Sequence, residues 1–589
     1  MTRNRTVLSR FVWAVAIILL IGASNACSRR EAAEQADLLI TNGNVYTLTW
    51  GEPSADGTPV QGAPHTAAGW KGDAQAIATR RDKILFVGSN EEALQYRGAA
   101  TRVIDARGAT VIPGLVDSHV HIVELGRALE RVNLVDVPSE AEAVERVAAR
   151  AAGTPKGEWI FGYGWDDGAW ADHYPDMNLL SRKVPDHPVY LRGLHGYAVW
   201  GNRLAFEKAG ITASTKSPDG GEIRKGRDGK PTGILLNRAV SLLESAVPPA
   251  TPQQLDARIL AALQAMAAGG YVAVEEAGAD SAMMAAFERL AAAGRLPIRM
   301  NAMLEARDEA LTRAWLAKGP DKSTERMLTV ECVKFFYDGA LGSRGALMLA
   351  DYSDQKGHRG VGGAPYGFNR DLALQSMKAG FQIAVHAIGD AANRETLDLL
   401  ESGIAAQPEA RALRHRIEHA QVLDPADVPR FAKLGIIASM EPPHAVEDKG
   451  WAQDRIGQER VKYAYAWRSL RSSGTTMVFN SDLPGTDYNI FYGLHSAITR
   501  QGKDHLPEGG WHPEQRMTAE EALRGYTNWA AYAAFWEKET GTLAPGKWAD
   551  ITMMDLDPLA VGETDPGKLL NGSITMTIVA GKVVYEKKN

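Results

Sequence analysis

Two histidines separated by one residue, His119 and His121, are the first side chains in this sequence that could do metal chemistry. Successive side chains of a β-strand point to opposite faces, so Asp117, His119 and His121 would project from one side of a strand. The apolar run 109–116 in front of them is typical of a buried strand. Two neighbouring imidazoles can bind one metal ion. The pair alone is a weak signal, and its interpretation depends on further ligands downstream.

Four more residues with suitable side chains follow at the ends of predicted strands. They are Lys334, His386, His419 and Asp482. When parallel strands close into a barrel, their carboxyl ends meet at one face, where active sites lie. We therefore expect these residues to converge with His119 and His121 on one centre. A surface or salt-bridged lysine is the plainer interpretation of Lys334.

A middle section of alternating strands and helices must position these groups. Eight apolar runs read as buried strands: 114–116, 271–274, 298–303, 329–336, 381–386, 416–419, 436–440 and 475–479. Helical stretches such as 255–268 and 393–400 lie between many of them. Eight strands with helical crossovers predict an α/β fold of the (β/α)8 TIM-barrel class. An open eight-stranded sheet is the alternative, and the expected convergence of the ligands favours closure.

Strand-rich segments flank this middle section at both ends of the chain. Residues 36–113 contain short strands and turns, and residues 536–589 have the same character. We expect the two to form one small β-sandwich beside a barrel of residues 114–535. A long insertion, about 122–252, follows the first barrel strand and is dense in aromatic and turn residues. Insertions at the catalytic end of a barrel commonly form lids, which is the role we expect here.

The first residues have the features of an export signal. A basic head precedes the apolar run 11–21, which is shorter than the roughly 20 residues of a membrane-spanning helix. Small residues then lead to Cys27, and the stretch resembles the lipobox of bacterial lipoproteins, with Ser24 where leucine is usual. We expect residues 1–26 to be a signal peptide and Cys27 to be lipidated. An uncleaved membrane anchor is the alternative.

The predicted location follows from this signal. Residues 27–35 are charged and small, which suits a tether between a lipid anchor and the folded protein. Ser28 is not aspartate, and the resemblance to lipoprotein sorting rules then favours the periplasmic side of the outer membrane. A periplasmic or N-terminally anchored protein is the alternative. Cys332 is the only other cysteine, so no internal disulfide framework is available.

Composition argues against some partner classes. The net charge of −6 is small for 589 residues, and no basic patch stands out, so we expect no nucleic-acid partner. A small molecule is the expected ligand. The sequence does not predict an oligomeric state.

At the level of motifs, the chain resembles the amidohydrolase superfamily over nearly its whole mature length. It is most similar to the subgroup of N-substituted formamide deformylases and related amidohydrolase-3 proteins. The matching motifs lie at residues 111–121, 338–344, 416–421, 480–484 and 541–550. The family fold is a metal-dependent barrel with a β-sandwich made from both termini, which agrees with the strand pattern above.

The resemblance implies a ligand set. His119, His121 and Asp482 would bind one metal, His386 and His419 would bind a second, and a carboxylated Lys334 would bridge both. Mixed nitrogen and oxygen ligands favour zinc, while iron, manganese or a single metal would also fit. Carboxylation requires a neutral lysine, which burial beside metals favours. Cys332 faces the same side as Lys334 and is the alternative bridging ligand.

The implied reaction is hydrolysis of a C–N bond in an amide, formamide or cyclic amide. Bound metal lowers the pKa of its water from 15.7 to about 7, and Asp482 would pass a proton to the leaving nitrogen. Five residues are candidate substrate contacts: His444, Arg344, His195, Tyr197 and Trp165. Arg344 could instead brace its loop, and Trp165 could pack in the core of the insertion. The alternatives in function are a lipoprotein that binds a small molecule without turnover, and a metal-dependent isomerase.

Overall fold

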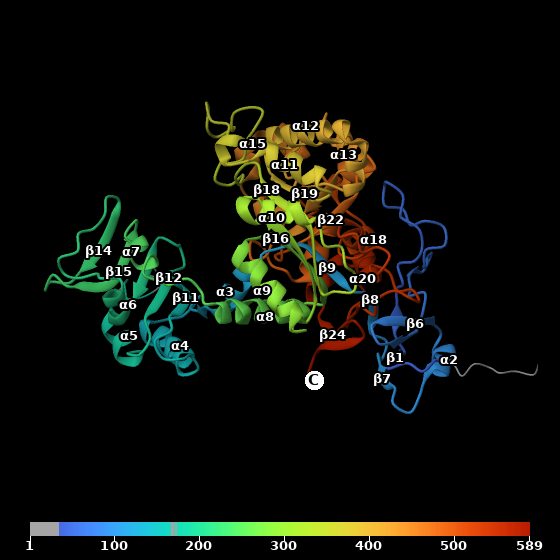
Figure 1. Cartoon of the computed structure of the whole chain (residues 1–589), viewed down its shortest axis with the longest axis horizontal. Helices are drawn as coiled ribbons and strands as arrows, with labels where there is room; N and C mark the ends of the chain where they lie inside the picture. Colours follow the sequence, from blue (N-terminus) through green and yellow to red (C-terminus); the bar gives the residue numbers. More distant parts are fainter. Residues whose placement is uncertain (1–33, 167–169, 171–173, 589) are drawn as a thin grey trace, which may run out of the picture.

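The structure is a computed structural model that describes residues 34–166, 170 and 174–588 (Figure 1). The predicted signal peptide 1–26 and Cys27 lie outside the described residues, as does most of the predicted tether 27–35. Within the described part of the chain, every helix is too short or too polar to cross a lipid bilayer.

Eight parallel strands form the central sheet, and their order in space is their order in the sequence. They are β9 (Leu115–Val120), β16 (Tyr271–Ala279), β17 (Arg299–Glu305), β18 (Leu328–Phe336), β19 (Gln382–Ala387), β20 (Arg416–His419), β21 (Ile437–Met440) and β22 (Met477–Phe479). Nearly all of their residues are buried, as expected for a parallel sheet covered on both faces. The predicted α/β barrel is confirmed, and each of the eight predicted runs overlaps one of these strands.

The first and last strands meet and nearly close the barrel. The amide of His121 donates to the carbonyl of Leu483 at 3.0 Å, and the amide of Asp482 donates to the carbonyl of His119 at 3.0 Å. Ser118 adds a side-chain hydrogen bond to the carbonyl of Phe479, at the end of β22. The place where β9 meets β22 and the barrel closes is therefore also the place where His119 and His121 meet Asp482.

Helices cover the outside of the barrel, and local sequence sets where they begin. The main covering helices are α8 (Pro252–Ala268), α9 (Ser281–Ala292), α10 (Glu309–Lys318), α11 (Arg370–Lys378), α12 (Asp390–Ala406), α13 (Val428–Leu434), α16 (Trp467–Ser472), α18 (Ala519–Gly525) and α19 (Asn528–Ala533). Thr251 and Gln254 form a capping box at the start of α8, where Pro252 occupies the first helical position. Such a cap satisfies amides that would otherwise lack partners.

Both ends of the chain build the β-sandwich. One sheet contains β6 (Lys83–Gly88), β5 (Ala76–Arg80), β1 (Leu38–Thr41) and β7 (Arg102–Asp105). The other contains β2 (Asn44–Val45), β8 (Thr110–Pro113), β23 (Ile551–Met554), β24 (Ile574–Val579) and β25 (Lys582–Glu586). In the second sheet β8 pairs with β23, so N-terminal and C-terminal strands share one ladder. Apolar residues from both ends form the core between the sheets.

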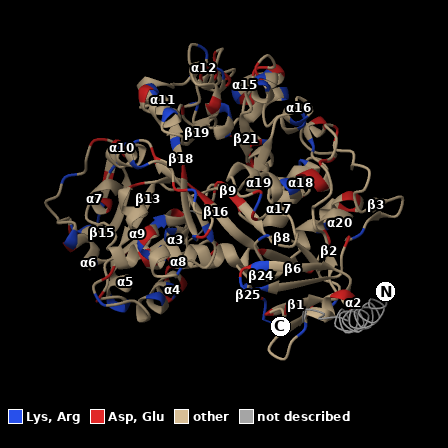
Figure 2. Ribbon diagram, turned by 45° about the vertical axis from the view of Figure 1, so that its right-hand side comes forward, with Lys and Arg blue, Asp and Glu red and all other residues tan. Residues whose placement is uncertain are grey.

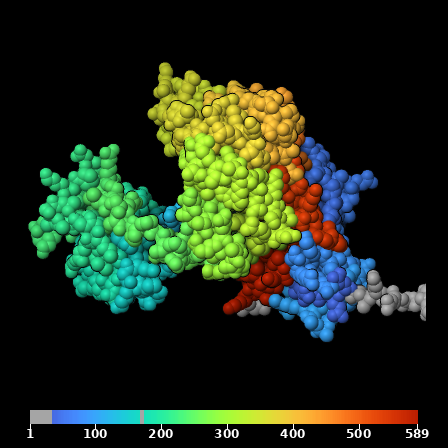
Figure 3. All heavy atoms as spheres, viewed as in Figure 1, coloured from blue at the N-terminus to red at the C-terminus, as the bar shows by residue number. Residues whose placement is uncertain are grey.

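The insertion after the first barrel strand folds around its own core. A six-stranded sheet contains β10 (Val132–Asn133), β11 (Ile160–Trp165), β12 (Val189–Gly193), β13 (Ala198–Gly201), β15 (Pro231–Asn237) and β14 (Gly221–Lys225). Its helices are α4 (Glu140–Ala152), α5 (Met177–Lys183), α6 (Arg203–Lys208) and α7 (Val240–Glu244). Its two apolar clusters contain only residues between Val132 and Leu243. Figures 1 and 3 show this part as a separate lobe beside the barrel.

The connection between lobe and barrel consists of two neighbouring helices. Helix α3 (Ile122–Glu130) leads out of β9, and α8 leads back to β16. The two pack against each other, with Arg258 of α8 paired to Glu130 of α3. Acidic and basic residues are intermixed on the ribbons of both parts (Figure 2).

Candidate active site

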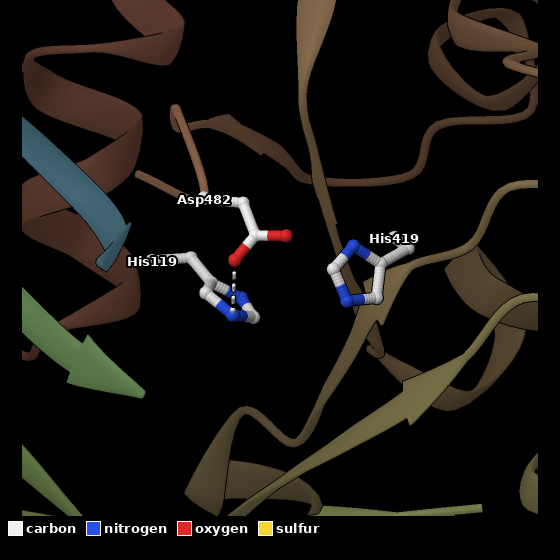
Figure 4. A group of neighbouring side chains, drawn as sticks. All are labelled: His119, His419 and Asp482. Carbon is white, nitrogen blue, oxygen red and sulfur yellow. Dashed lines mark ion pairs between the residues drawn. The ribbon is translucent and has the colours of Figure 1, made fainter. Parts of the chain in front are cut away.

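All six predicted metal ligands lie at the carboxyl ends of barrel strands and line one cavity of about 470 Å³. They come from or directly follow β9 (His119, His121), β18 (Lys334), β19 (His386), β20 (His419) and β22 (Asp482). In Figure 4 the rings of His119 and His419 lie on either side of the Asp482 carboxylate. The barrel thus gathers residues that are far apart in the sequence.

The Asp482 carboxylate lies within reach of both histidines of the opening pair. Its Oδ1 is 3.4 Å from Nε2 of His119 and 3.1 Å from Nε2 of His121. The Nζ atom of Lys334 is 3.2 Å from the same Nε2 of His119. His119, His419 and Asp482 each offer a ligand atom within 4.8 Å of the other two, which is close enough to share one ion.

Two of the histidines are oriented through their second ring nitrogen. Nδ1 of His119 is 2.7 Å from Oε2 of Glu418, and Nδ1 of His419 is 3.1 Å from Oε2 of Glu441. A carboxylate at Nδ1 fixes the tautomer and leaves the lone pair of Nε2 for a metal. Nε2 of His386 is buried, and no described residue gives it a hydrogen bond. This donor set fits a divalent metal centre.

Lys334 is buried and lines the cavity. Its side chain forms a hydrogen bond to His119 and, among the described residues, no ion pair. Burial lowers the pKa of Lys334, with nearby carboxylates acting in the opposite direction. An amine with a lowered pKa is more often neutral at physiological pH, and only the neutral amine can react with carbon dioxide.

The backbone around the ligands is strained. His419 and Asp482 have φ angles of 71° and 48°, in the left-handed region that side chains other than glycine rarely adopt. Such residues cost of order 1–3 kcal/mol and persist where surrounding contacts hold them. Asp117 provides such contacts, because its carboxylate accepts hydrogen bonds from the amide and the hydroxyl of Ser481. Asp117 thus braces the turn that carries Asp482.

A buried arginine supports His119 from inside the barrel. Arg416 donates to Glu418 at 2.8 Å and to Glu275 at 2.8 Å, and all three side chains are fully buried. Burial alone would raise the pKa of Glu418, but the charge of Arg416 and the contact with His119 hold it well below its usual range. Glu418 therefore remains a carboxylate that can accept the His119 N–H. The sequence interpretation assigned no role to Arg416, Glu418 or Glu441.

Asp338 organises the loops around the cavity. Its carboxylate accepts hydrogen bonds from the amides of Leu347, Ile388 and Gly389. It therefore joins the loop after β18 to the loop after β19. Burial raises the pKa of Asp338 to about 7, while these amides act in the opposite direction.

Two predicted substrate contacts lie on the barrel side. His444 lines the cavity, with Nδ1 3.3 Å from Glu441. Arg344 does not line it, because its guanidinium donates to both carboxylate oxygens of Asp354, at 3.0 and 2.8 Å. Arg455 pairs with the same Asp354. Arg344 therefore braces its loop, which is the alternative that the sequence left open.

The three candidates in the insertion lie apart from the ligands. Trp165 is fully buried in the core of the lobe and donates to the carbonyl of Leu191, so it is unavailable to a substrate in this structure. His195 and Tyr197 are exposed on the lobe, with stacked rings whose centroids are 6.4 Å apart. No described residue of the insertion lines the cavity, because the lobe stands beside the barrel (Figure 3).

Cys332 does not reach the ligand cluster. It is buried in the barrel interior in a small apolar cluster with Ala277, Met303 and Ala384. The cysteine is two residues earlier than Lys334 and shares its face, so it lies one layer deeper in the barrel.

Comparison with known proteins now identifies the family. The model of the Amidohydrolase family matches residues 102–585, which is most of the chain. The chain belongs to the amidohydrolase family. It is 31% identical to the putative amidohydrolase YtcJ of Bacillus subtilis strain 168, over 87% of this chain and 96% of that protein. It is 29% identical to the N-substituted formamide deformylase of Arthrobacter pascens, over 94% of this chain and 99% of that protein.

A solved structure agrees with this assignment. The crystal structure of an uncharacterized metal-dependent hydrolase from Pyrococcus furiosus superposes with a TM-score of 0.69 at 27% identity. The match covers 89% of this chain and 99% of that one. This amidohydrolase is therefore a metal-dependent hydrolase of C–N bonds in the amidohydrolase-3 subgroup, and its ligand is a divalent metal.

Proposed function

We propose that this amidohydrolase holds two divalent metal ions, most readily zinc, bridged by a carboxylated Lys334. His119, His121 and Asp482 would bind one ion, and His386 and His419 the other. The substrate would be a small amide, formamide or cyclic amide. The relative from Arthrobacter pascens, a deformylase of N-substituted formamides by name, supports this substrate class.

One observation carries the proposal. The amine of Lys334 is buried 3.2 Å from Nε2 of His119, in the middle of four histidines and an aspartate. A protonated ammonium there would repel any bound cation. A carbamate on the same nitrogen would instead offer two hard oxygen ligands, of the kind that zinc accepts beside imidazole.

Residues of the chain would transfer the proton and orient the metal ligands. Bound divalent metal would polarise the carbonyl of the substrate and lower the pKa of water to about 7. Oδ1 of Asp482 lies 3.1 Å from Nε2 of His121, beside the proposed metal ions. There it can take a proton from the attacking water. It would then deliver that proton to the leaving nitrogen. Glu418 and Glu441 would keep the imidazoles of His119 and His419 in the required tautomer.

We also propose that the protein acts outside the cytoplasm. The apolar run before Cys27 supports export, and a lipid on Cys27 would tether it to the periplasmic side of the outer membrane. Labelling of the expressed chain with a fatty acid tests this, because Cys27→Ala should lose the label.

The function is tested by metal analysis and a substrate panel. Purified mature protein should contain divalent metal and hydrolyse some N-formyl amines, N-acyl amines or cyclic amides. A chelator should abolish turnover, and added zinc should restore it. His119→Ala should reduce turnover by at least about 100-fold, because it removes a ligand held by Glu418. The matched control is His505→Ala, an exposed histidine outside the cavity.

Two results would contradict the proposal. Turnover that is indifferent to chelators would exclude the metal, and binding without turnover across the panel would favour a non-catalytic binding protein. Lys334→Ala tests the bridge separately. It should lower the metal content per chain, and unchanged metal content would rule out a bridging role.

A further inference from the structure

Apolar side chains share the lining of this cavity with the metal ligands. They are Phe336, Leu341, Ile388 and Trp451, and the ring of Phe336 lies 5.7 Å from that of His386. Trp451 lies close against the loop after β18, since a Cβ added at Gly342 would stand only 3.2 Å from the indole. This apolar lining can therefore contact an apolar substituent of a substrate whose carbonyl lies at the metal site.

A carboxylate other than that of Asp482 also lines the cavity. Asp448 is the last residue of α14 (Pro442–Asp448) and lines the cavity. It is four residues after His444, so the two side chains share one face of the helix, with Cβ atoms about 5–6 Å apart. Asp448 is thus placed about one helical turn beyond the histidine that approaches the ligands.

Two hydrogen bonds from neutral donors hold the carboxylate of Asp448 in place. Its Oδ2 accepts hydrogen bonds from the Tyr465 hydroxyl, at 2.5 Å, and from the Gln421 amide, at 3.2 Å. Among the described residues, no lysine or arginine pairs with Asp448, and its Oδ1 has no hydrogen-bond partner. A cavity-lining carboxylate that is held by two neutral donors and has no lysine or arginine partner is a favourable place for an ammonium group, with His444 as the nearest basic side chain on the same helix.

We propose that Asp448 is a specificity determinant that selects amides whose apolar substituent carries a protonated amino group. The carbonyl would lie at the metal ligands, the apolar part along Phe336, Leu341 and Trp451, and the ammonium at Asp448. Placement at Asp448 also keeps the positive charge away from the divalent metal. The inference rests on the proposed function for the reaction, and it adds the class of substrate.

Matched pairs of compounds test the proposal. Metal-loaded full-length protein is given N-formyl-1,4-diaminobutane and N-formylpentylamine, which differ by an ammonium in place of a methyl group. A second pair, 6-aminohexanamide and heptanamide, puts the charge on the acyl side. The measured quantity is the ratio of kcat/KM for the charged compound to that for the neutral one. Dissociation constants from calorimetry give the same ratio for any pair that is not turned over.

The variant is Asp448→Asn, which keeps an acceptor for Tyr465 and removes the charge. We expect the ratio to fall by about 10- to 100-fold in at least one pair. The matched control is Glu447→Gln, on the same helix but outside the cavity lining, and it should leave the ratio unchanged. Asp448→Glu should keep part of the preference because it keeps the charge.

The outcomes separate the two proposals. A wild-type preference for neutral compounds, or a ratio unchanged in Asp448→Asn, would overturn the role of Asp448. A fall in both rates with no change in their ratio would show that Asp448 only supports Tyr465 and Gln421, and it would also overturn the proposal. Absence of any turnover, with a charge preference in binding that Asp448→Asn removes, would contradict the proposed hydrolysis and support the subsite.

Discussion

Glu418 contacts a metal-site histidine on one side and a buried arginine on the other. Its Oε2 is 2.7 Å from His119, and its Oε1 accepts from Arg416 at 2.8 Å. Arg416 in turn donates to the carbonyl of Ser118, the residue before His119. Glu418 therefore fixes the ring of His119, and Arg416 fixes the backbone next to it. Metal binding then has less conformational freedom of His119 to remove.

This arrangement predicts the effect of Glu418→Gln. The amide cannot accept the His119 N–H as strongly as a carboxylate, and Arg416 loses a charged partner. We expect metal affinity to fall by about 10- to 100-fold, as is typical for residues that orient metal ligands. Competition with a chromophoric chelator measures this without relying on activity.

The matched control is another buried glutamate that pairs with arginine away from the site. Glu520 is buried and accepts from Arg524 at 2.9 Å. Glu520→Gln should destabilise the fold to a similar extent but leave metal affinity unchanged. Equal metal affinity in Glu418→Gln and the parent would show that His119 does not depend on this carboxylate.

Sequence reasoning reached the metal donors but not their supporting residues. The ligands are recognisable because their types are chemically distinctive and because each ends a strand. Glu418 stands next to His419, and strand alternation would place the two on opposite faces. Arg416 and Glu418, two residues apart, do share the interior face, whereas His419 closes the strand with a φ of 71°. The spacing of two residues between Arg416 and Glu418 was the feature of the sequence that could have predicted a buried ion pair on the interior face of this strand.

At the scale of elements, His415 joins three strands at the amino-terminal end of the barrel. Its Nδ1 accepts from the amide of Ile383 in β19 at 3.1 Å, and its carbonyl accepts from the amide of Ile437 in β21 at 2.9 Å. The ring is almost fully buried, and burial lowers its pKa to about 3. The neutral ring is therefore part of the strand junction.

This junction predicts a pH dependence of stability. The pKa of a histidine is about 6.5 in an unfolded chain, so the unfolded state binds the extra proton first as the pH falls. The stabilisation is complete above about pH 6.5 and is lost toward pH 3, at up to about 1.36 kcal/mol per pH unit. His415→Asn keeps an acceptor near Nδ1 and cannot titrate, so its melting temperature should fall less between pH 7 and pH 4.5.

Comparison with the parent isolates this contribution. Buried carboxyls such as Asp338, with a pKa raised to about 7, have the opposite sign, because the folded state then binds the proton first. They are present in both proteins and cancel in the difference. His505→Asn, at an exposed position, is the control and should follow the parent. Parallel curves for His415→Asn and the parent would contradict the assignment.

Two of the barrel strands have almost the bounds expected from the sequence, whereas β16 continues to Ala279, beyond the expected run 271–274. β18 spans Leu328–Phe336 where the run 329–336 was expected, and β20 spans Arg416–His419 as expected. The six-stranded sheet of the insertion was not anticipated. Its strands are short, and their pairing joins segments such as β12 and β13 with β15 across loops, which local pattern does not determine.

At the scale of the whole molecule, the insertion behaves as a body with its own core. Its apolar clusters contain residues between Val132 and Leu243 alone, while the large barrel cluster passes from Leu125 directly to Ile259. Helices α3 and α8 remain with the barrel. Few apolar contacts therefore couple the stability of the lobe to that of the barrel.

This separation predicts that residues 131–250 fold alone. The isolated segment should show mixed α/β circular dichroism and a cooperative thermal transition. The full chain should show the same transition beside that of the barrel in calorimetry. The control is a segment of similar length from the barrel, residues 271–390, which lacks its partner strands and should remain unfolded. An unfolded isolated lobe would show that its stability comes from the barrel.

The seam between β9 and β22 has a consequence for biosynthesis. The histidine pair leaves the ribosome early, whereas the aspartate that meets it belongs to the end of the barrel. A chain still being translated therefore carries incomplete coordination and cannot cut an amide. The ligand set is complete only when β22 packs beside β9. A chain that terminates before β22 therefore has no hydrolytic activity.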